Sequence, residues 1–155
     1  MRRKDRELTQ KEDIQDIIQL GNVCRIAMFA EEYPYIIPLN YGYEWNDQLK
    51  LYFHCAQEGR KVDLLKVNNN VGFEIDIDHE LVTANEPCGW GMKYKSAVGN
   101  GKMIEITSNE EKTHALDLLM EHHGFKGKPV YPAIMLTKIK IYCLEVHNIT
   151  GKART

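Results

Sequence analysis

The feature that most limits the fold is a change of hydrophobic period at Gly21. Before it, three isoleucines recur at the spacing of one helical face, which predicts a helix over residues 9–20 that a capping box at Thr9 starts. After it, short segments with alternating apolar residues follow one another along most of the chain, which is the pattern of β-strands. The sequence therefore predicts a mainly β protein.

The predicted strands are close neighbours in sequence, and helices are expected only over residues 9–20, 60–67 and 108–123. A Rossmann-type parallel sheet, in which strands and helices alternate, is therefore disfavoured. The sequence predicts one domain over residues 1–155: an antiparallel β-barrel of about six or seven strands with three peripheral helices, after a loose segment 1–8. Strands are expected at residues 23–30, 35–43, 49–55, 71–77, 94–106 and 134–149, with a less regular stretch at 79–92.

Composition and charge exclude several classes of protein. The chain of 155 residues has a net charge of −2 and is 43% hydrophobic, which is ordinary globular composition. A domain that grips nucleic acid is usually basic, so no nucleic-acid partner is expected. No apolar stretch approaches the ~20 residues of a membrane helix, and no apolar run follows the basic start, so we expect no membrane association and a cytoplasmic location. The four cysteines lack C-x-x-C spacing, so neither a disulfide framework nor a metal site is expected.

Residues 51–65 carry the most chemical information. A predicted strand is followed by a turn at Gly59 and by a helix that starts with Arg60 and Lys61. A helix start offers free N–H groups and the positive end of the helix dipole, so two cations beside it favour a phosphate group. A solvated Arg–Lys pair in a first helical turn is the alternative. His54, at the end of the strand, is interpreted either as a structural residue or as a functional group beside this turn.

Two further segments combine features of a ligand site. Pro38 lacks an N–H, so a flat heterocycle can lie against this strand beside Asn40, although an ordinary edge strand fits as well. In residues 90–101, aromatic, basic and hydroxyl side chains alternate on a strand interrupted by glycines. This pattern suits a cofactor wall, a dimer contact or a plain barrel strand. The pair His122–His123, near a helix end, is expected to bond carbonyl groups rather than a metal.

Taken together and in this order, the segments resemble the flavin-binding split barrels related to pyridoxamine 5'-phosphate oxidase, and within them the 5-nitroimidazole-resistance (Nim-like) branch. The resemblance is carried by Pro-Leu-Asn-Tyr-Gly at residues 38–42 and His-x-Ala-x-x-Gly-Arg-Lys at residues 54–61. Residues 23–27, 94–99 and 149–152 also match, so the resemblance covers most of residues 8–152.

The resemblance implies an FMN-dependent oxidoreductase that is a homodimer, with FMN at the subunit interface and a small molecule such as a nitroaromatic compound as substrate. It implies His54 as the catalytic residue, which donates a proton or orients the substrate, and Lys61 with Arg60 as the phosphate ligands. Lys95 stands where many relatives have Arg, and it offers a point charge rather than a bidentate fork. The implied FMN contacts are Pro38, Leu39, Asn40, Tyr41, His54, Cys55, Ala56, Arg60, Lys61, Tyr94, Lys95, Ser96 and Gly99.

Two rival functions stay open at this stage. The chain is alternatively a flavin-binding module without turnover, or a module for another planar cofactor such as haem, because one fold hosts several functions. Residues 79–92 have no counterpart in the resemblance, and loops of this kind are expected to influence the choice of substrate.

Overall fold

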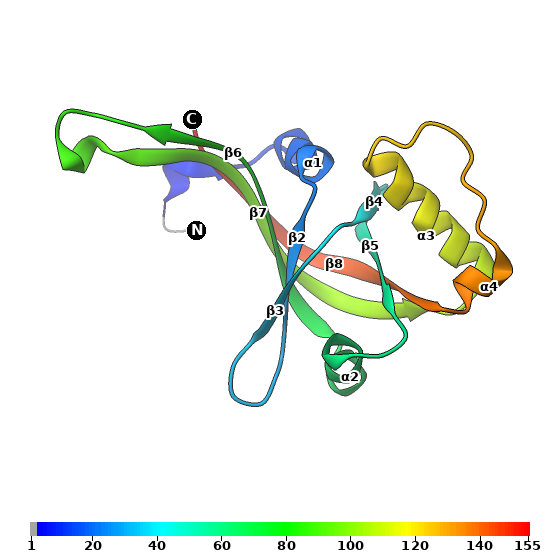
Figure 1. Cartoon of the computed structure of the whole chain (residues 1–155). Helices are drawn as coiled ribbons and strands as arrows, with labels where there is room; N and C mark the ends of the chain where they lie inside the picture. Colours follow the sequence, from blue (N-terminus) through cyan, green and yellow to red (C-terminus); the bar gives the residue numbers. More distant parts are fainter. Residues whose placement is uncertain (1–2) are drawn as a thin grey trace.

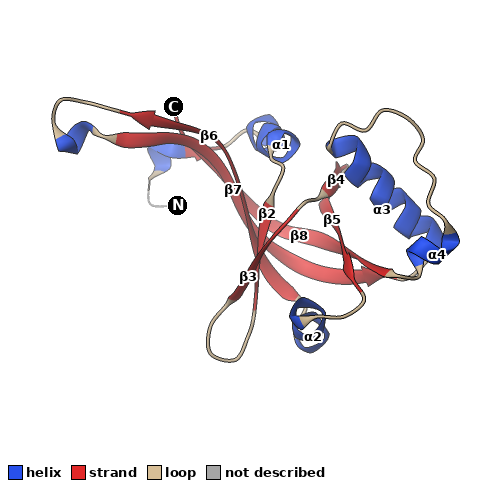
Figure 2. Ribbon diagram, viewed as in Figure 1, coloured by secondary structure: helices blue, strands red, loops and turns tan. Residues whose placement is uncertain are grey.

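Eight antiparallel strands and four α-helices make up residues 3–155, the part of the chain that the computed structural model describes (Figure 2). In chain order they are β1 (Glu7–Leu8), α1 (Lys11–Leu20), β2 (Cys24–Met28), β3 (Tyr35–Leu39), β4 (Gly42–Trp45), β5 (Leu49–Ala56), α2 (Arg60–Val67), β6 (Asn70–Val82), β7 (Gly91–Ile106), α3 (Asn109–His122), α4 (Ala133–Leu136) and β8 (Ile139–Arg154), with 3-10 turns at Lys4–Arg6 and Pro87–Gly89. Within residues 3–155, no helix is both long and apolar enough to cross a membrane.

The order of the strands explains why the sheet curls into a barrel. The order is β3-β2-β6-β7-β8-β5-β4, so the two edge strands, β3 and β4, are consecutive in sequence. Only Asn40 and Tyr41 separate them, and such a connection spans at most about 11 Å. The two edges of the sheet are therefore brought together by the chain itself, without a hydrogen-bonded ladder between them (Figure 1). This is a split barrel, as the sequence predicted.

Three long strands extend the sheet beyond the barrel. Strands β6, β7 and β8 contain 13, 16 and 16 residues, and the β6–β7 hairpin projects from the body as an arm (Figure 1). Between Gly99 and Gly101 the strand is irregular, because the β7–β8 register shifts after Asn100. A side chain at Gly99 would meet the ring of Phe73, and one at Gly101 would strike the carbonyl oxygen of Glu145.

The core has two parts, one on each face of the sheet. Inside the curl, the apolar face of α1 packs with the inward residues of the strands, and Ile17 and Ile18 are fully buried. Outside, α3 and α4 cover Tyr52, Ile141 and Cys143 at one end of β5 and β8. The alternation predicted at residues 71–77 is confirmed, because Val71, Phe73, Ile75 and Ile77 are buried and the residues between them are not.

Several boundaries differ from the prediction. Helix α1 begins at Lys11 with Gln10 as its N-cap, and no side chain caps it, so the predicted Thr9 box is wrong. The predicted strand 35–43 is two strands, because the chain crosses from one sheet edge to the other at Asn40 and Tyr41. The last strand begins at Ile139 rather than Ile134, since Pro132 caps the short helix α4.

The two ends of the long strands also differ from expectation. Much of the stretch 79–92 is ordered hairpin, and β6 continues to Val82. Glu7 and Leu8, expected in a loose segment, pair with Lys152 and Gly151 of β8. Residues 1 and 2 of that segment lie outside the described residues. The helix predicted over residues 108–123 is confirmed, and its start is capped by the Ser108 hydroxyl, which accepts a bond from the Glu111 N–H.

Candidate functional site

The two segments that carry the sequence motif flank the split of the barrel. Strands β4 and β5 pair from Trp45–Leu49 as far as Gly42–Tyr52, and no further pair follows. Beyond that point β3 joins β2, and β5 stays with β8 alone. If the β4–β5 register continued, Asn40 would stand opposite His54. The unpaired edges of β3 and of the end of β5 therefore both border the split, where backbone groups are free for a ligand.

The side chains beside the split divide between two faces. Leu39 and Cys55 point inward and pack against the main core. Asn40 and His54 point the other way and are exposed, and so are their neighbours Pro38 and Ala56. Pro38 lies on an edge strand, which was one of the alternatives left open for this segment. The structure thus brings Pro38, Leu39, Asn40, His54, Cys55 and Ala56 to one place.

Side-chain hydrogen bonds to the end of α1 and the residues after it fix the crossover between β3 and β4. The Asn40 amide donates to the carbonyl oxygen of Asn22 over 2.9 Å. The Tyr41 hydroxyl lies 2.7 Å from the Ile18 carbonyl oxygen and 3.0 Å from that of Gly21. The Tyr41 side chain has no exposed surface, so it supports the crossover from the core.

His122, which was not among the predicted site residues, also supports the crossover. The Nε2 atom of His122 lies 2.7 Å from the Gly21 carbonyl oxygen, so His122 bonds a carbonyl of α1 rather than of its own helix. Its ring also lies against Tyr41, with centroids 4.7 Å apart, and edge-on to Tyr43. We name Gly21, Asn40, Tyr41 and His122 the crossover clamp. The only signal for it in the sequence was the His122–His123 pair at a helix end.

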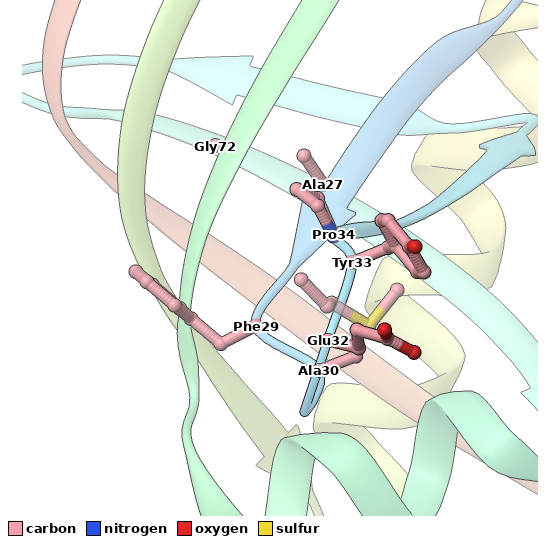
Figure 3. Close-up of a pocket in the computed structure, with 8 residues that line it drawn as sticks. Ala27, Phe29, Ala30, Glu32, Tyr33, Pro34 and Gly72 are labelled. Atoms are coloured by element: carbon pink, nitrogen blue, oxygen red, sulfur yellow. The ribbon is translucent and has the colours of Figure 1, made fainter.

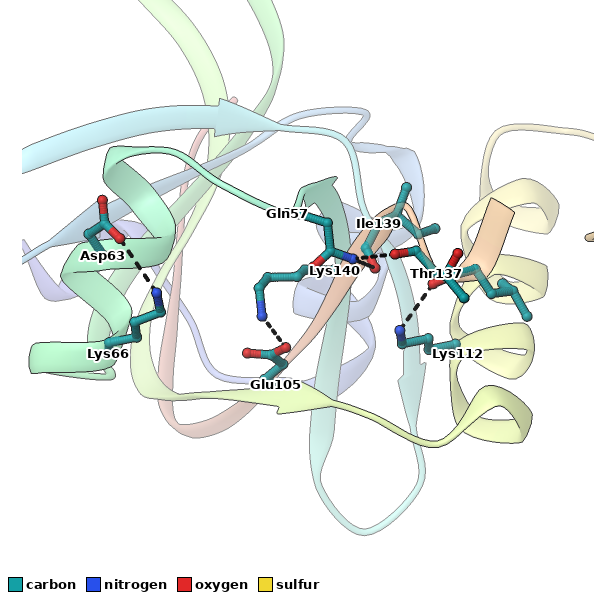
Figure 4. Close-up of polar contacts among 9 residues, drawn as sticks. Gln57, Asp63, Lys66, Glu105, Lys112, Thr137, Ile139 and Lys140 are labelled. Carbon is teal, nitrogen blue, oxygen red and sulfur yellow. Dashed lines mark hydrogen bonds and ion pairs between the residues drawn. The ribbon is translucent and has the colours of Figure 1, made fainter. Parts of the chain in front are cut away.

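The turn between β5 and α2 is anchored and open. The Gln57 amide donates to the carbonyl oxygens of Thr137 and Ile139, each over 2.9 Å, which ties the turn to the start of β8 (Figure 4). Gly59 has φ +134°, a conformation that favours glycine, and a side chain there would meet nothing within 4 Å. No side chain caps α2, so its first N–H groups are available to an anion.

The cations of this turn are positioned over the split. The Arg60 guanidinium lies 5.1 Å from the ring of Tyr35 on β3, so it reaches from α2 to the opposite edge of the split. Partial burial, and then the charge of Lys61, lower the pKa of His54 from its usual value. Burial raises the pKa of the Cys55 thiol, although Lys61 and Lys140 oppose that shift. Lys61 thus lies beside both His54 and Cys55, and Lys140 is held by an ion pair with Glu105 (Figure 4).

The remaining predicted contacts form a second group on β7. Ser96 is paired with Lys152 on β8 and with Asp76 on β6. Lys95 makes an ion pair with Asp78 over 3.1 Å, and Lys152 lies 5.5 Å from the ring of Tyr94. Gly99, further along the strand, is required by the ring of Phe73, which is a packing reason for this glycine.

The two groups do not meet within one chain. His54 is paired with Ile141, which is paired with Ile106 of β7. Ser96 stands ten residues before Ile106 in the same strand, a path of about 30 Å. The structure therefore separates Tyr94, Lys95 and Ser96 from the residues around the split.

A pocket of about 300 Å³ lies elsewhere, at the β2–β3 turn (Figure 3). It is mainly apolar, and Phe29 and Tyr33 on its wall are largely exposed. None of the predicted site residues lines it. We place the candidate site at the split rather than here, because this pocket lacks the cations and the free helix start.

Comparisons with known proteins agree with this architecture. The chain is 35% identical to a candidate 5-nitroimidazole antibiotic resistance protein of Bacteroides thetaiotaomicron VPI-5482, with a TM-score of 0.83 over 95% of this chain and 86% of that one. It is 26% identical over 152 residues to an uncharacterized protein of Rhizobium meliloti strain 1021, which covers 92% of this chain and 91% of the relative. The flavocytochrome Anf3 of Azotobacter vinelandii shares the fold, with a TM-score of 0.81 at 16% identity over 100% of this chain and 72% of that one.

The family model described as pyridoxamine 5'-phosphate oxidase matches residues 10–153. The match includes both strands that border the split and the whole of the β6–β7 arm. The chain therefore belongs to the pyridoxamine 5'-phosphate oxidase family.

Proposed function

We propose that the chain binds FMN between two of its copies and uses it to reduce a small acceptor, with His54 beside the reacting face. The observation that carries the proposal is the separation of the two groups of predicted contacts. A flavin bound at the split of one chain is out of reach of Ser96 in the same chain, about 30 Å along the sheet from the His54 rung. A symmetric second copy supplies the β7 group to that flavin.

The residues around the split suit the parts of FMN. The phosphate is matched by Lys61, Arg60 and the uncapped N–H groups of α2. The exposed faces of Pro38 and Ala56 suit a flat ring, and the free edge of β3 offers backbone groups to its polar rim. Flavin-containing relatives of the same fold include the flavocytochrome Anf3, which supports a flavin in this chain.

The roles of the side chains follow from their positions. Bound FMN supplies the two-electron redox chemistry. Lys61 and Arg60 hold the phosphate end, while the crossover clamp keeps the Pro38–Asn40 backbone in place. His54 holds or donates a proton, and its lowered pKa keeps most of the imidazole neutral at neutral pH. The acceptor proposed is a nitroaromatic compound, on the strength of the resemblance to the Bacteroides protein.

An absorption spectrum of the purified chain, with mass identification of any bound ligand, tests the proposal. A flavin spectrum that a reductant bleaches and that a 5-nitroimidazole restores is the expected result. A flavin that bleaches and stays bleached when a 5-nitroimidazole is added in the absence of oxygen marks a binding module without turnover. A sharp Soret band marks a haem protein and overturns the proposal.

A further inference from the structure

A second polar pocket lies on the arm, away from the split. It has a volume of about 410 Å³, within the range of small-molecule sites. It is formed where β6, β7 and the end of β8 meet, near the C-terminal end of the described chain (Figure 1). We name it the arm pocket, and its lining residues are Asp78, His79, Glu80, Lys93, Tyr94, Lys95, Arg154 and Thr155.

The absence of a side chain at Gly91 makes room for the guanidinium of Arg154 in this pocket. Its guanidinium lies so close to the backbone of Gly91 that a Cβ at that position would overlap it. Gly91 does not adopt a positive φ, so backbone conformation does not demand a glycine there. The absence of a side chain at residue 91 therefore serves to let the guanidinium lie flat on β7.

The charges of the arm pocket are not balanced. Lys95 is paired with Asp78 over 3.1 Å, and Lys93 with Glu80 over 3.5 Å. Arg154 has no carboxylate partner among residues 3–155. A positioned guanidinium with two further cations beside it favours a bound anion, because its planar fork matches two anionic oxygens.

The backbone is strained at the same place. Asp78 has φ +59°, and it alone among the non-glycine residues of the described chain has a positive φ. It lies in the register shift between Ile77 and Glu80, where β6 bulges against β7. Bulges and strained residues gather at functional sites, where they direct a side chain. Asp78, at this bulge, pairs with Lys95 and not with Arg154.

We propose that the arm pocket binds the phosphate group of a small molecule, with Arg154 as the principal ligand and Lys93 and Lys95 as supporting charges. Within one chain this site is separate from the phosphate site proposed at Lys61. Its lining residues Tyr94 and Lys95 are also in the group that the proposed function gives to the flavin of a second copy, so the inference is tested on the flavin-free chain. A phosphate suits it because a dianion compensates Arg154 and still attracts the two lysines, which a single carboxylate does less well.

The test follows the backbone amide NMR signals of residues 93–95 while inorganic phosphate, and separately phenyl phosphate, is added to the full chain. Saturable shifts are expected with both, and tighter binding of phenyl phosphate indicates that an organic group fills the rest of the pocket. Gly91→Ala moves the guanidinium without straining the backbone and is expected to weaken binding about tenfold. Arg154→Gln is expected to weaken it at least as much.

Two controls keep the result specific. Lys102→Gln removes one positive charge from the same strand outside the pocket and is expected to leave phosphate binding unchanged. In the flavin-free chain, Lys61→Ala is expected to leave the shifts at residues 93–95 unchanged, so failure here is distinguishable from failure of the flavin proposal. Shifts that sodium chloride reproduces, or that survive in Arg154→Gln, would overturn the inference.

Discussion

Lys61 is the residue at which two proposed interactions meet. It lies in the first turn of α2, beside His54 and Cys55, and its charge lowers the pKa of both side chains relative to burial alone. The proposal gives it the phosphate of FMN. A phosphate ligand and a merely structural residue can be told apart by substitution. Removal of the Lys61 ammonium group should weaken binding of a phosphate far more than it disturbs the packing of α2.

We predict that Lys61→Ala weakens FMN binding about tenfold or more, since a charge-assisted contact to a partly buried phosphate is worth roughly 1.5–3 kcal/mol. Riboflavin, which has no phosphate, should lose much less affinity. Fluorescence titration of both ligands measures this. Lys66→Ala is the matched control, because Lys66 lies in the same helix and is paired with the exposed Asp63. Equal losses for FMN and riboflavin would show that Lys61 is structural.

His54 separates chemistry from binding. His54→Ala is expected to keep the flavin and to lower turnover by about 10²–10⁴-fold if the imidazole is a general acid. Because its pKa lies below the usual 6.5, the protonated fraction grows as pH falls, so the rate of the wild type should rise toward acid pH. His54→Gln should remove that rise. Full turnover in His54→Ala at every pH between 5 and 8 would mean that another residue supplies the proton.

At the scale of elements, the position of α3 depends on direct contact with a strand. Gly42 of β4 lies against the backbone of Leu119, so a Cβ there would overlap the helix itself. We predict that Gly42→Ala destabilises the fold by about 1–3 kcal/mol, the usual cost of overpacking. Urea unfolding measures it as a lower midpoint at unchanged slope. Gly72→Ala, whose Cβ would meet no atom closer than 3.8 Å, is the control and should change stability little.

The crossover clamp links α1, the crossover and α3, and it is expected to weaken in acid. Partial burial, opposed by the bond to Gly21, lowers the pKa of His122 from 6.5. A folded-state pKa below the unfolded one means that the stabilisation is complete above about pH 6.5 and is lost as pH falls through the folded value. The stability difference between wild type and His122→Gln should therefore shrink between pH 7.5 and pH 5 in urea titrations. A difference that stays constant with pH would show that His122 does not titrate in this range.

Local patterns predicted the elements better than the contacts between them. The helix 60–67 was predicted at its observed bounds, because a Gly turn and three asparagines mark both ends. The strand 35–43 was not predicted as two strands, since its division depends on the Tyr41 hydroxyl reaching Ile18 and Gly21, about twenty residues earlier. The last strand was predicted to begin at Ile134, but Pro132 starts a helical turn there.

On the scale of the whole molecule, the predicted contact residues are divided between the split and the arm. The motif resemblance named residues of both groups, but sequence spacing did not reveal their distance. That distance follows from strand length and from the β5–β8–β7 pairing. The pairing places His54 in the same row across the sheet as Ile106, which lies ten residues after Ser96 in β7. His122 and Gln57 were missed as site residues because their partners, Gly21 and the start of β8, are remote in sequence.

Under the proposed function, this division makes flavin binding depend on the second copy. A chain that keeps its flavin should be a dimer, and loss of the dimer on dilution should release the flavin in parallel, because binding to the assembled state shifts its equilibrium.

The central claim, a flavin site shared between two copies, therefore has a direct measurement. Light scattering and flavin absorbance are recorded together across a dilution series of the FMN-loaded chain. We predict about twice the 18.0 kDa chain mass wherever flavin is bound, and a species of 18.0 kDa that retains FMN with undiminished affinity would contradict the account.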